Sequence, residues 1–152
     1  MDLQQKLKEL RIELPPAPKP VGAYVPGLRS GNLVFTSGQL PLRDGKLIAM
    51  GKVPVDVPLA MAQDCARQAA LNALAVVQSV AGSLDAVARV VRVNIFVNSA
   101  PGFFDQAAVG NGASQLLTDI FGESGKHTRC AIGAAELPLN APVELDMIVE
   151  VK

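Results

Sequence analysis

Arg129 is the residue whose surroundings most clearly indicate chemistry. It begins a small, apolar segment, Cys130-Ala131-Ile132-Gly133-Ala134-Ala135, where a cation is costly unless it has a partner. Glu144 opens the next predicted strand, and an antiparallel pairing across residues 138–142 would bring the two charges toward one end of a sheet. Two interpretations remain open: an interstrand ion pair that stabilises the sheet, or an arginine fork for a substrate carboxylate with the glutamate as acid, base or water-positioning group.

Other reactive side chains carry weaker signals. His127 and Cys130 could form a base and a nucleophile, because a thiolate needs an adjacent base or cation. A small buried cysteine and a solvated loop histidine are the more common outcome, and Cys65, in the middle of a helical pattern, is expected in the core. Tyr24 and Ser37 flank the first predicted strand, and each alone is typical of packing or of a turn.

Composition bounds the class of protein. The chain has 152 residues, of which 49% are hydrophobic and 18% charged, so we expect one packed domain whose apolar surface is partly buried between copies. Fourteen basic and fourteen acidic residues cancel, and there is one tyrosine and no tryptophan, which argues against a large nucleic-acid footprint. Two cysteines and one histidine exclude a disulfide framework and a tetrahedral zinc site. No apolar run approaches membrane length, so no membrane contact is expected and the expected compartment is the cytoplasm.

The elements that must position these residues follow from periodicity and turn chemistry. Residues 1–20 predict an N-terminal helix and a Pro-rich arm, and residues 21–152 form the body. Predicted strands cover 32–37, 87–97, 130–137 and 143–151, with a hairpin at Asp44-Gly45 and helices over 58–80 and 104–121. Gly82 ends the first of these helices, while Gly110 and Gly112 weaken the first turns of the second. The order β-β-β-α-β-α-β-β predicts an α+β layer with two helices on one sheet face.

Several segments taken together resemble the RidA family, also called YjgF or L-PSP. The segments are Gly22-x-Tyr24, GNLVFTSGQLP at 31–41, VVRVNIFV at 90–97, Arg129-Cys130-Ala131-Ile132, Leu137-Pro138 and Val143-Glu144-Leu145. The resemblance implies a chorismate-mutase-like α+β fold with a mixed sheet, assembled as a homotrimer with ligand clefts between subunits. The segment after Tyr24, Val25-Pro26-Gly27, departs from the family pattern.

The resemblance also implies a function. Members hydrolyse reactive enamine and imine intermediates, such as 2-aminoacrylate and 2-imino acids, to 2-keto acids and ammonia, without a cofactor and without a metal. Carried over, Arg129 binds the substrate carboxylate and Glu144 holds the attacking water. Tyr24, Ser37 and Cys130 line the cleft, and Asn111 matches a cleft asparagine before the second helix. Two alternatives are a non-catalytic trimer that binds small carboxylates or partner proteins, and an endoribonuclease, against which the neutral charge counts.

Overall fold

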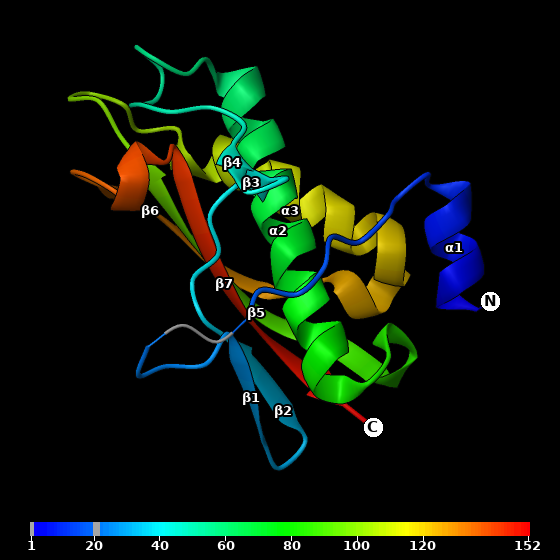
Figure 1. The fold of residues 1–152 in the computed structure, drawn as a ribbon. Helices are drawn as coiled ribbons and strands as arrows, with labels where there is room; N and C mark the ends of the chain where they lie inside the picture. The colour runs from blue at the N-terminus through cyan, green and yellow to red at the C-terminus, as the bar shows by residue number, and fades with distance from the viewer. Residues whose placement is uncertain (1, 20–21) are drawn as a thin grey trace.

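A computed structural model describes residues 2–19 and 22–152 of the chain. One sheet carries two long helices on one face, and a short N-terminal helix lies beside the outer long helix (Figure 1). The predicted boundary between arm and body, at residues 20 and 21, lies outside the described residues. None of the described helices is both long and apolar enough to cross a bilayer.

The sheet is mixed, as predicted. Its five strands lie side by side in the order β1 (Gly27–Ser30), β2 (Leu33–Thr36), β7 (Val143–Val151), β5 (Val87–Asn98) and β6 (Thr128–Ala134). Only the pairing of β5 with β6 is parallel. Two short strands, β3 (Leu42–Arg43) and β4 (Lys46–Leu47), form a separate hairpin around Asp44-Gly45.

Side chains alternate between two unlike faces of this sheet. Along β5, Val93, Ile95 and Val97 are buried against the helices, whereas the residues between them are partly exposed. The strand β7 alternates in the same way over its whole length. We call the side toward the helices the helix face and the other side the open face.

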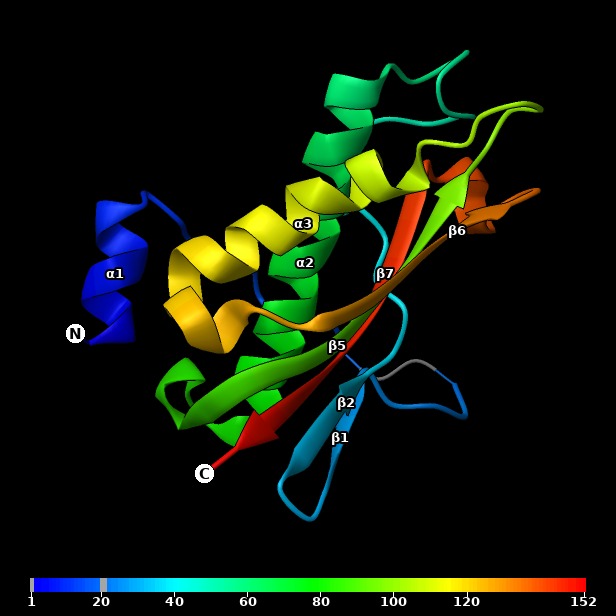
Figure 2. The same ribbon diagram turned by 180° about the vertical axis from the view of Figure 1, so that it is seen from behind.

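Two long helices, α2 (Leu59–Ala81) and α3 (Gln106–Phe121), cover the helix face (Figure 2). The buried stripe of α2 is rich in alanine, which lets α3 come close to it. A Cβ on Gly112 would overlap the main-chain oxygen of Gln63 in α2, so this glycine sets the distance between the two helices. Three short 3-10 turns, η1 (Leu84–Ala86), η2 (Gly122–Gly125) and η3 (Pro138–Asn140), connect elements.

The N-terminal segment packs on the same layer. Helix α1 (Leu3–Glu9) begins at the cap residue Asp2 and buries Leu7 beside α3. The arm that follows passes across α2, and Leu14 packs against the core (Figure 1). The segment therefore covers the helical layer of its own chain and leaves the open face uncovered.

The predicted elements are largely confirmed, and the differences are local. Strand β7 matches its predicted span, and α2 ends at Gly82, which has a positive φ. Strand β6 begins and ends earlier than expected. Strand β1 was missed, because Gly27-Leu-Arg-Ser30 has neither alternation nor β-branched residues and becomes a strand only by pairing with β2.

We predict that Gly112→Ala destabilises the protein by about 1–3 kcal/mol, because the new methyl group meets main-chain atoms of α2 that cannot move aside cheaply. Helix propensity alone would change the free energy of unfolding in the opposite direction, since it favours alanine over glycine by about 1 kcal/mol. Urea unfolding measures the difference, and Ala107→Gly, on the exposed side of α3, reports the propensity effect without the overlap. A more stable Gly112→Ala variant would contradict the close helix packing.

Candidate functional site

Arg129 lies on β6, opposite Val93 of β5, and therefore faces α3. Its Nη1 donates to Asn111 Oδ1 at 2.9 Å and to Ser114 Oγ at 3.2 Å. Asn111 and Ser114 are three residues apart on α3 and so share the helix side that contacts β6. The guanidinium is thus fixed by two neutral side chains.

Gly110 makes room for this guanidinium. A Cβ at this position would come within 2.8 Å of Ile95 Cδ1 and 3.2 Å of Arg129 Nη1. The sequence-based expectation was that Gly110 weakens the start of the helix. In the fold, it allows the start of α3 to lie close over β5 and the arginine.

His127 completes the group on this side. Its Nε2 lies 3.0 Å from Ser114 Oγ, and its Nδ1 lies 2.6 Å from the Gly125 carbonyl oxygen. Burial lowers the pKa of His127 below its usual value, the Gly125 carbonyl acts in the opposite sense, and the nearby Arg129 cation lowers it further. We call Asn111, Ser114, His127 and Arg129 the Arg129 cluster.

Within residues 2–19 and 22–152, which the structure describes, no acidic side chain forms an ion pair with Arg129. The ion pair found in these residues joins Lys126 and Glu123 on the surface. A half-buried guanidinium without a carboxylate partner is suited to binding an anion.

Glu144 lies on the open face. It is opposite Phe96 of β5, at the beginning of β7. Gln39 and Leu145 exchange both main-chain hydrogen bonds, so the Ser37-Gly38-Gln39 segment runs beside β7, and a Cβ on Gly38 would overlap Glu144 Oε1. Burial raises the pKa of Glu144, and the neighbouring Asp146 carboxylate raises it further.

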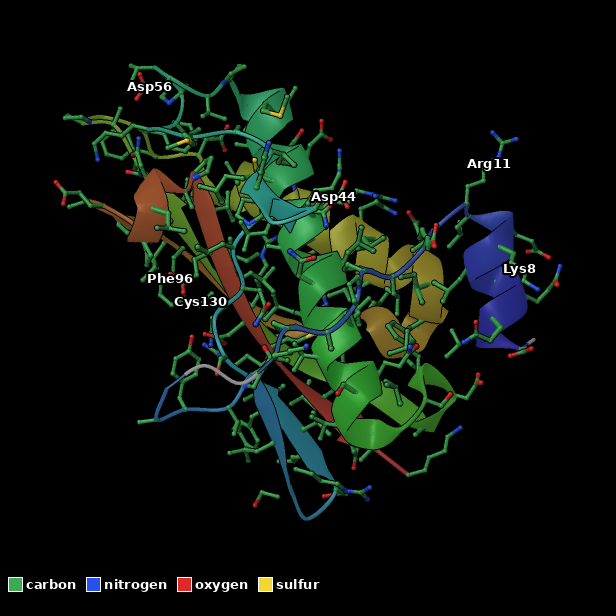
Figure 3. The ribbon with its side chains drawn as sticks, viewed as in Figure 1. Lys8, Arg11, Asp44, Asp56, Phe96 and Cys130 are labelled. Atoms are coloured by element: carbon green, nitrogen blue, oxygen red, sulfur yellow. The ribbon has the colours of Figure 1, made fainter. Side chains whose placement is uncertain are left out.

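Of the other predicted cleft residues, Ser37 and Cys130 lie on the same side as Glu144, whereas Asn111 belongs to the Arg129 cluster on the helix face. Ser37 Oγ donates to the Val25 carbonyl at 2.6 Å, which holds the loop that carries Tyr24, and the Tyr24 side chain is 64% exposed. Cys130 is opposite Asn94, on the open face, and Figure 3 shows it near Phe96 on the side of the sheet away from α2 and α3. These residues form an open-face group around Glu144.

The predicted pairing of Arg129 with Glu144 is wrong. Strand β5 lies between β6 and β7, so the two strands are not neighbours. Arg129 is opposite Val93 and Glu144 is opposite Phe96, three residues further along β5, which places the two side chains on opposite faces. The sheet-stabilising ion pair is therefore excluded.

Two smaller expectations are also corrected. His127 lies just before β6 and Cys130 lies within it, and His127 bonds to Ser114 on the helix face while Cys130 belongs to the open face. Asn111 lies inside α3, because the helix begins at Gln106. Cys65 is fully buried, as expected, and burial raises the pKa of its thiol to about 11.

Sequence reasoning missed Ser114. The available signal was its spacing: Asn111 and Ser114 are at i and i+3 on a helix, and His127 and Arg129 are at i and i+2 in extended chain that leads into a strand. Each pair shares a face, but only the packing of α3 against β6 brings the two pairs together. Within the described part of the chain, no group of three His, Cys, Asp or Glu side chains could hold a metal ion.

The chain matches a family model described as YjgF/chorismate mutase-like over residues 4–151, and the description also carries the word endoribonuclease. It is 43% identical to Protein TCP17 of Trypanosoma cruzi over 95% of this chain and 91% of that protein. It is 33% identical to the 2-iminobutanoate/2-iminopropanoate deaminase of Dermatophagoides farinae, over 93% and 95% of the two chains. A solved structure of a protein of unknown function from Agrobacterium tumefaciens superimposes with a TM-score of 0.91 at 46% identity, covering 99% of this chain and 92% of the other.

We predict that Glu144→Gln raises the thermal midpoint at pH 7. A raised folded-state pKa means that folding disfavours the charged carboxylate, so the stability that Glu144 contributes is present below pH 4.5 and is lost as the pH rises through the folded pKa. The glutamine stays neutral, so its advantage should shrink as the pH falls below 4.5. Calorimetry across this range tests the prediction, with Glu136→Gln as the exposed control; an effect independent of pH would contradict it.

Proposed function

Since this chain belongs to the YjgF/chorismate mutase-like family, we propose that it hydrolyses 2-imino acids and their enamine tautomers to 2-keto acids and ammonia. The 33% identity with a 2-iminobutanoate/2-iminopropanoate deaminase, over nearly the whole of both chains, supports this reaction class. The reaction requires water as its only co-reactant.

The observation that carries the proposal is that the Arg129 guanidinium is held in place but has no acidic partner. Its guanidinium is held by Asn111 and Ser114 while no carboxylate of its own chain, in the described residues, lies in ion-pair distance. A 2-imino acid presents a carboxylate next to its reactive carbon, so binding this carboxylate fixes the position of the imine. A charge-assisted hydrogen bond of this kind contributes about 1.5–3 kcal/mol.

Glu144 supplies the proton chemistry in this proposal. Its carboxylate accepts one proton from the attacking water as oxygen bonds to the imine carbon, and passes that proton to nitrogen. As the carbon–nitrogen bond breaks, the carboxylate moves the remaining hydroxyl proton to nitrogen, so the carbonyl forms and ammonia leaves. A raised pKa suits a group that must both accept and donate a proton. Tyr24, Ser37 and Cys130 would line the same cleft from the open face.

The site requires two copies of the chain. Because Arg129 and Glu144 lie on opposite faces of one sheet, a single chain cannot direct both at one small substrate. In the proposed homotrimer, Arg129 of one copy faces Glu144 of the next. The exposed apolar side chains on or beside the open face, Leu28 and Ile132, favour burial against a second copy.

Arg129→Ala should lower kcat/KM for 2-imino acids by about 10- to 100-fold, since it removes the bond to the substrate carboxylate. The measurement is 2-keto acid release from freshly generated imines of several side-chain sizes. Arg67→Ala, an exposed arginine on α2, serves as the matched control and should keep full activity.

If the wild-type protein accelerates the hydrolysis of no imine, the deaminase proposal is wrong, and the non-catalytic carboxylate-binding trimer becomes the favoured function. Glu144→Gln separates these two functions. Lost turnover with retained binding of a small 2-keto acid supports an enzyme, whereas unchanged turnover removes Glu144 from the mechanism.

A mixing experiment tests whether the site is shared. Arg129→Ala and Glu144→Gln chains, each expected to be impaired alone, are unfolded together and refolded. If each site takes its arginine and glutamate from different copies, about one quarter of the sites in an equal mixture regain both groups. If both groups came from one chain, no mixed assembly would recover activity.

A further inference from the structure

The proposed deaminase uses Ser114 only to hold the Arg129 guanidinium. Ser114 Oγ lies 3.0 Å from His127 Nε2 and 3.2 Å from Arg129 Nη1, between α3 and the edge strand β6. The side chain is half-buried and retains access to solvent. A hydroxyl hydrogen-bonded to a histidine is an arrangement in which serine nucleophiles are activated.

The hydrogen bonds fix where the protons are. The Gly125 carbonyl oxygen can only accept, so His127 Nδ1 carries the proton of the bond between them. In the neutral ring, Nε2 is then an acceptor, and Ser114 Oγ donates its proton to it. Arginine has only donors, so Ser114 Oγ accepts from Arg129 Nη1. The serine proton therefore points at a base, and a cation faces the oxygen that would become negative.

His127 is held in the form that a general base requires. Burial and the Arg129 cation lower its pKa, so the ring is neutral at pH 7. The groups that face it are Ser114 from α3, Arg129 from β6 and the main-chain carbonyl of Gly125, and none of these is an acid that would stabilise the imidazolium. The Gly125 carbonyl takes the orienting role that a third side chain has in serine hydrolases.

We propose that Ser114 is a nucleophile that accepts short acyl groups from activated esters, with His127 as its base and the Arg129 cation stabilising the negative charge that develops on Ser114 Oγ as its proton leaves. Ser114 Oγ bonds to the carbonyl carbon while its proton passes to His127 Nε2. The carbon–oxygen bond to the alcohol then breaks, and His127 returns the proton to the leaving alcohol. Water attacks the acyl-serine by the same route, releasing the carboxylic acid and restoring Ser114.

Short acyl groups suit a hydroxyl that is only partly exposed. Ser114 lies on α3 and contacts Arg129 of β6, which is an edge strand of the sheet. A small ester reaches Oγ there from solvent. The chemistry does not involve Glu144, but it shares Arg129 with the proposed deaminase.

The test uses 4-nitrophenyl acetate with the full-length protein. We expect an initial burst of nitrophenolate and an acetyl group on the peptide that contains Ser114, located by fragmentation mass spectrometry. Ser114→Ala should abolish both, and Ser124→Ala, an exposed serine in η2, should change neither. His127→Gly should slow acylation of Ser114 by about 100-fold, with added imidazole restoring part of the rate.

Imidazole rescue separates a base from a structural contact, because an imidazole in solution does not restore lost packing. Circular dichroism melting of each variant shows whether it is folded. Acetyl groups found only on lysines or Cys130 would overturn the proposal. So would acylation of Ser114 at the same rate in folded His127→Gly protein.

Discussion

The fold depends on β5, the one strand that bonds to both β6 and β7. Its pairing is regular from Arg92 to Val97, so each residue of β6 and β7 takes the face of its partner on β5. Arg129 pairs with Val93 and therefore faces the helices, whereas Glu144 pairs with Phe96 and therefore lies on the open face. Because β5 lies between β6 and β7, Arg129 and Glu144 are not on neighbouring strands, although the sequence suggested that they were. Successive side chains of a strand point to opposite faces, so the two charged groups lie on opposite sides of the sheet.

Close packing on the helix face depends on residues without side chains. Gly112 lets α3 approach α2, and Gly110 lets it approach Ile95 and the Arg129 guanidinium. On the open face, Gly38 leaves room for the Glu144 carboxylate. Glycine is costly inside a helix, so its presence in α3 is explained by contacts that any larger residue would block. The same glycines that shape the core therefore shape the surroundings of both charged candidates.

The two charged groups are left without a partner of opposite sign in their own chain, within the residues described. Arg129 is held by neutral side chains, and Glu144 lies beside Asp146, a like charge that disfavours its ionised form. A fold that optimised stability alone would pair or expose such groups. Opposite faces and opposite charges favour completion of the site by a second copy, in which each face supplies what the other lacks.

The sequence by itself determined the local structure and the candidate residues. Periodicity located α2, α3, β5 and β7, and residue type selected Arg129 and Glu144 as the groups able to do chemistry. Sequence reasoning missed β1, whose four residues form a strand only by pairing with β2. It also missed Ser114, whose hydroxyl is a candidate for chemistry only because it contacts His127. Strand order, the parallel pairing of β6 and the separation of Arg129 from Glu144 were decided by the tertiary structure. Periodicity records which residues share a face of one element, whereas the neighbour that a face meets depends on contacts between distant parts of the chain.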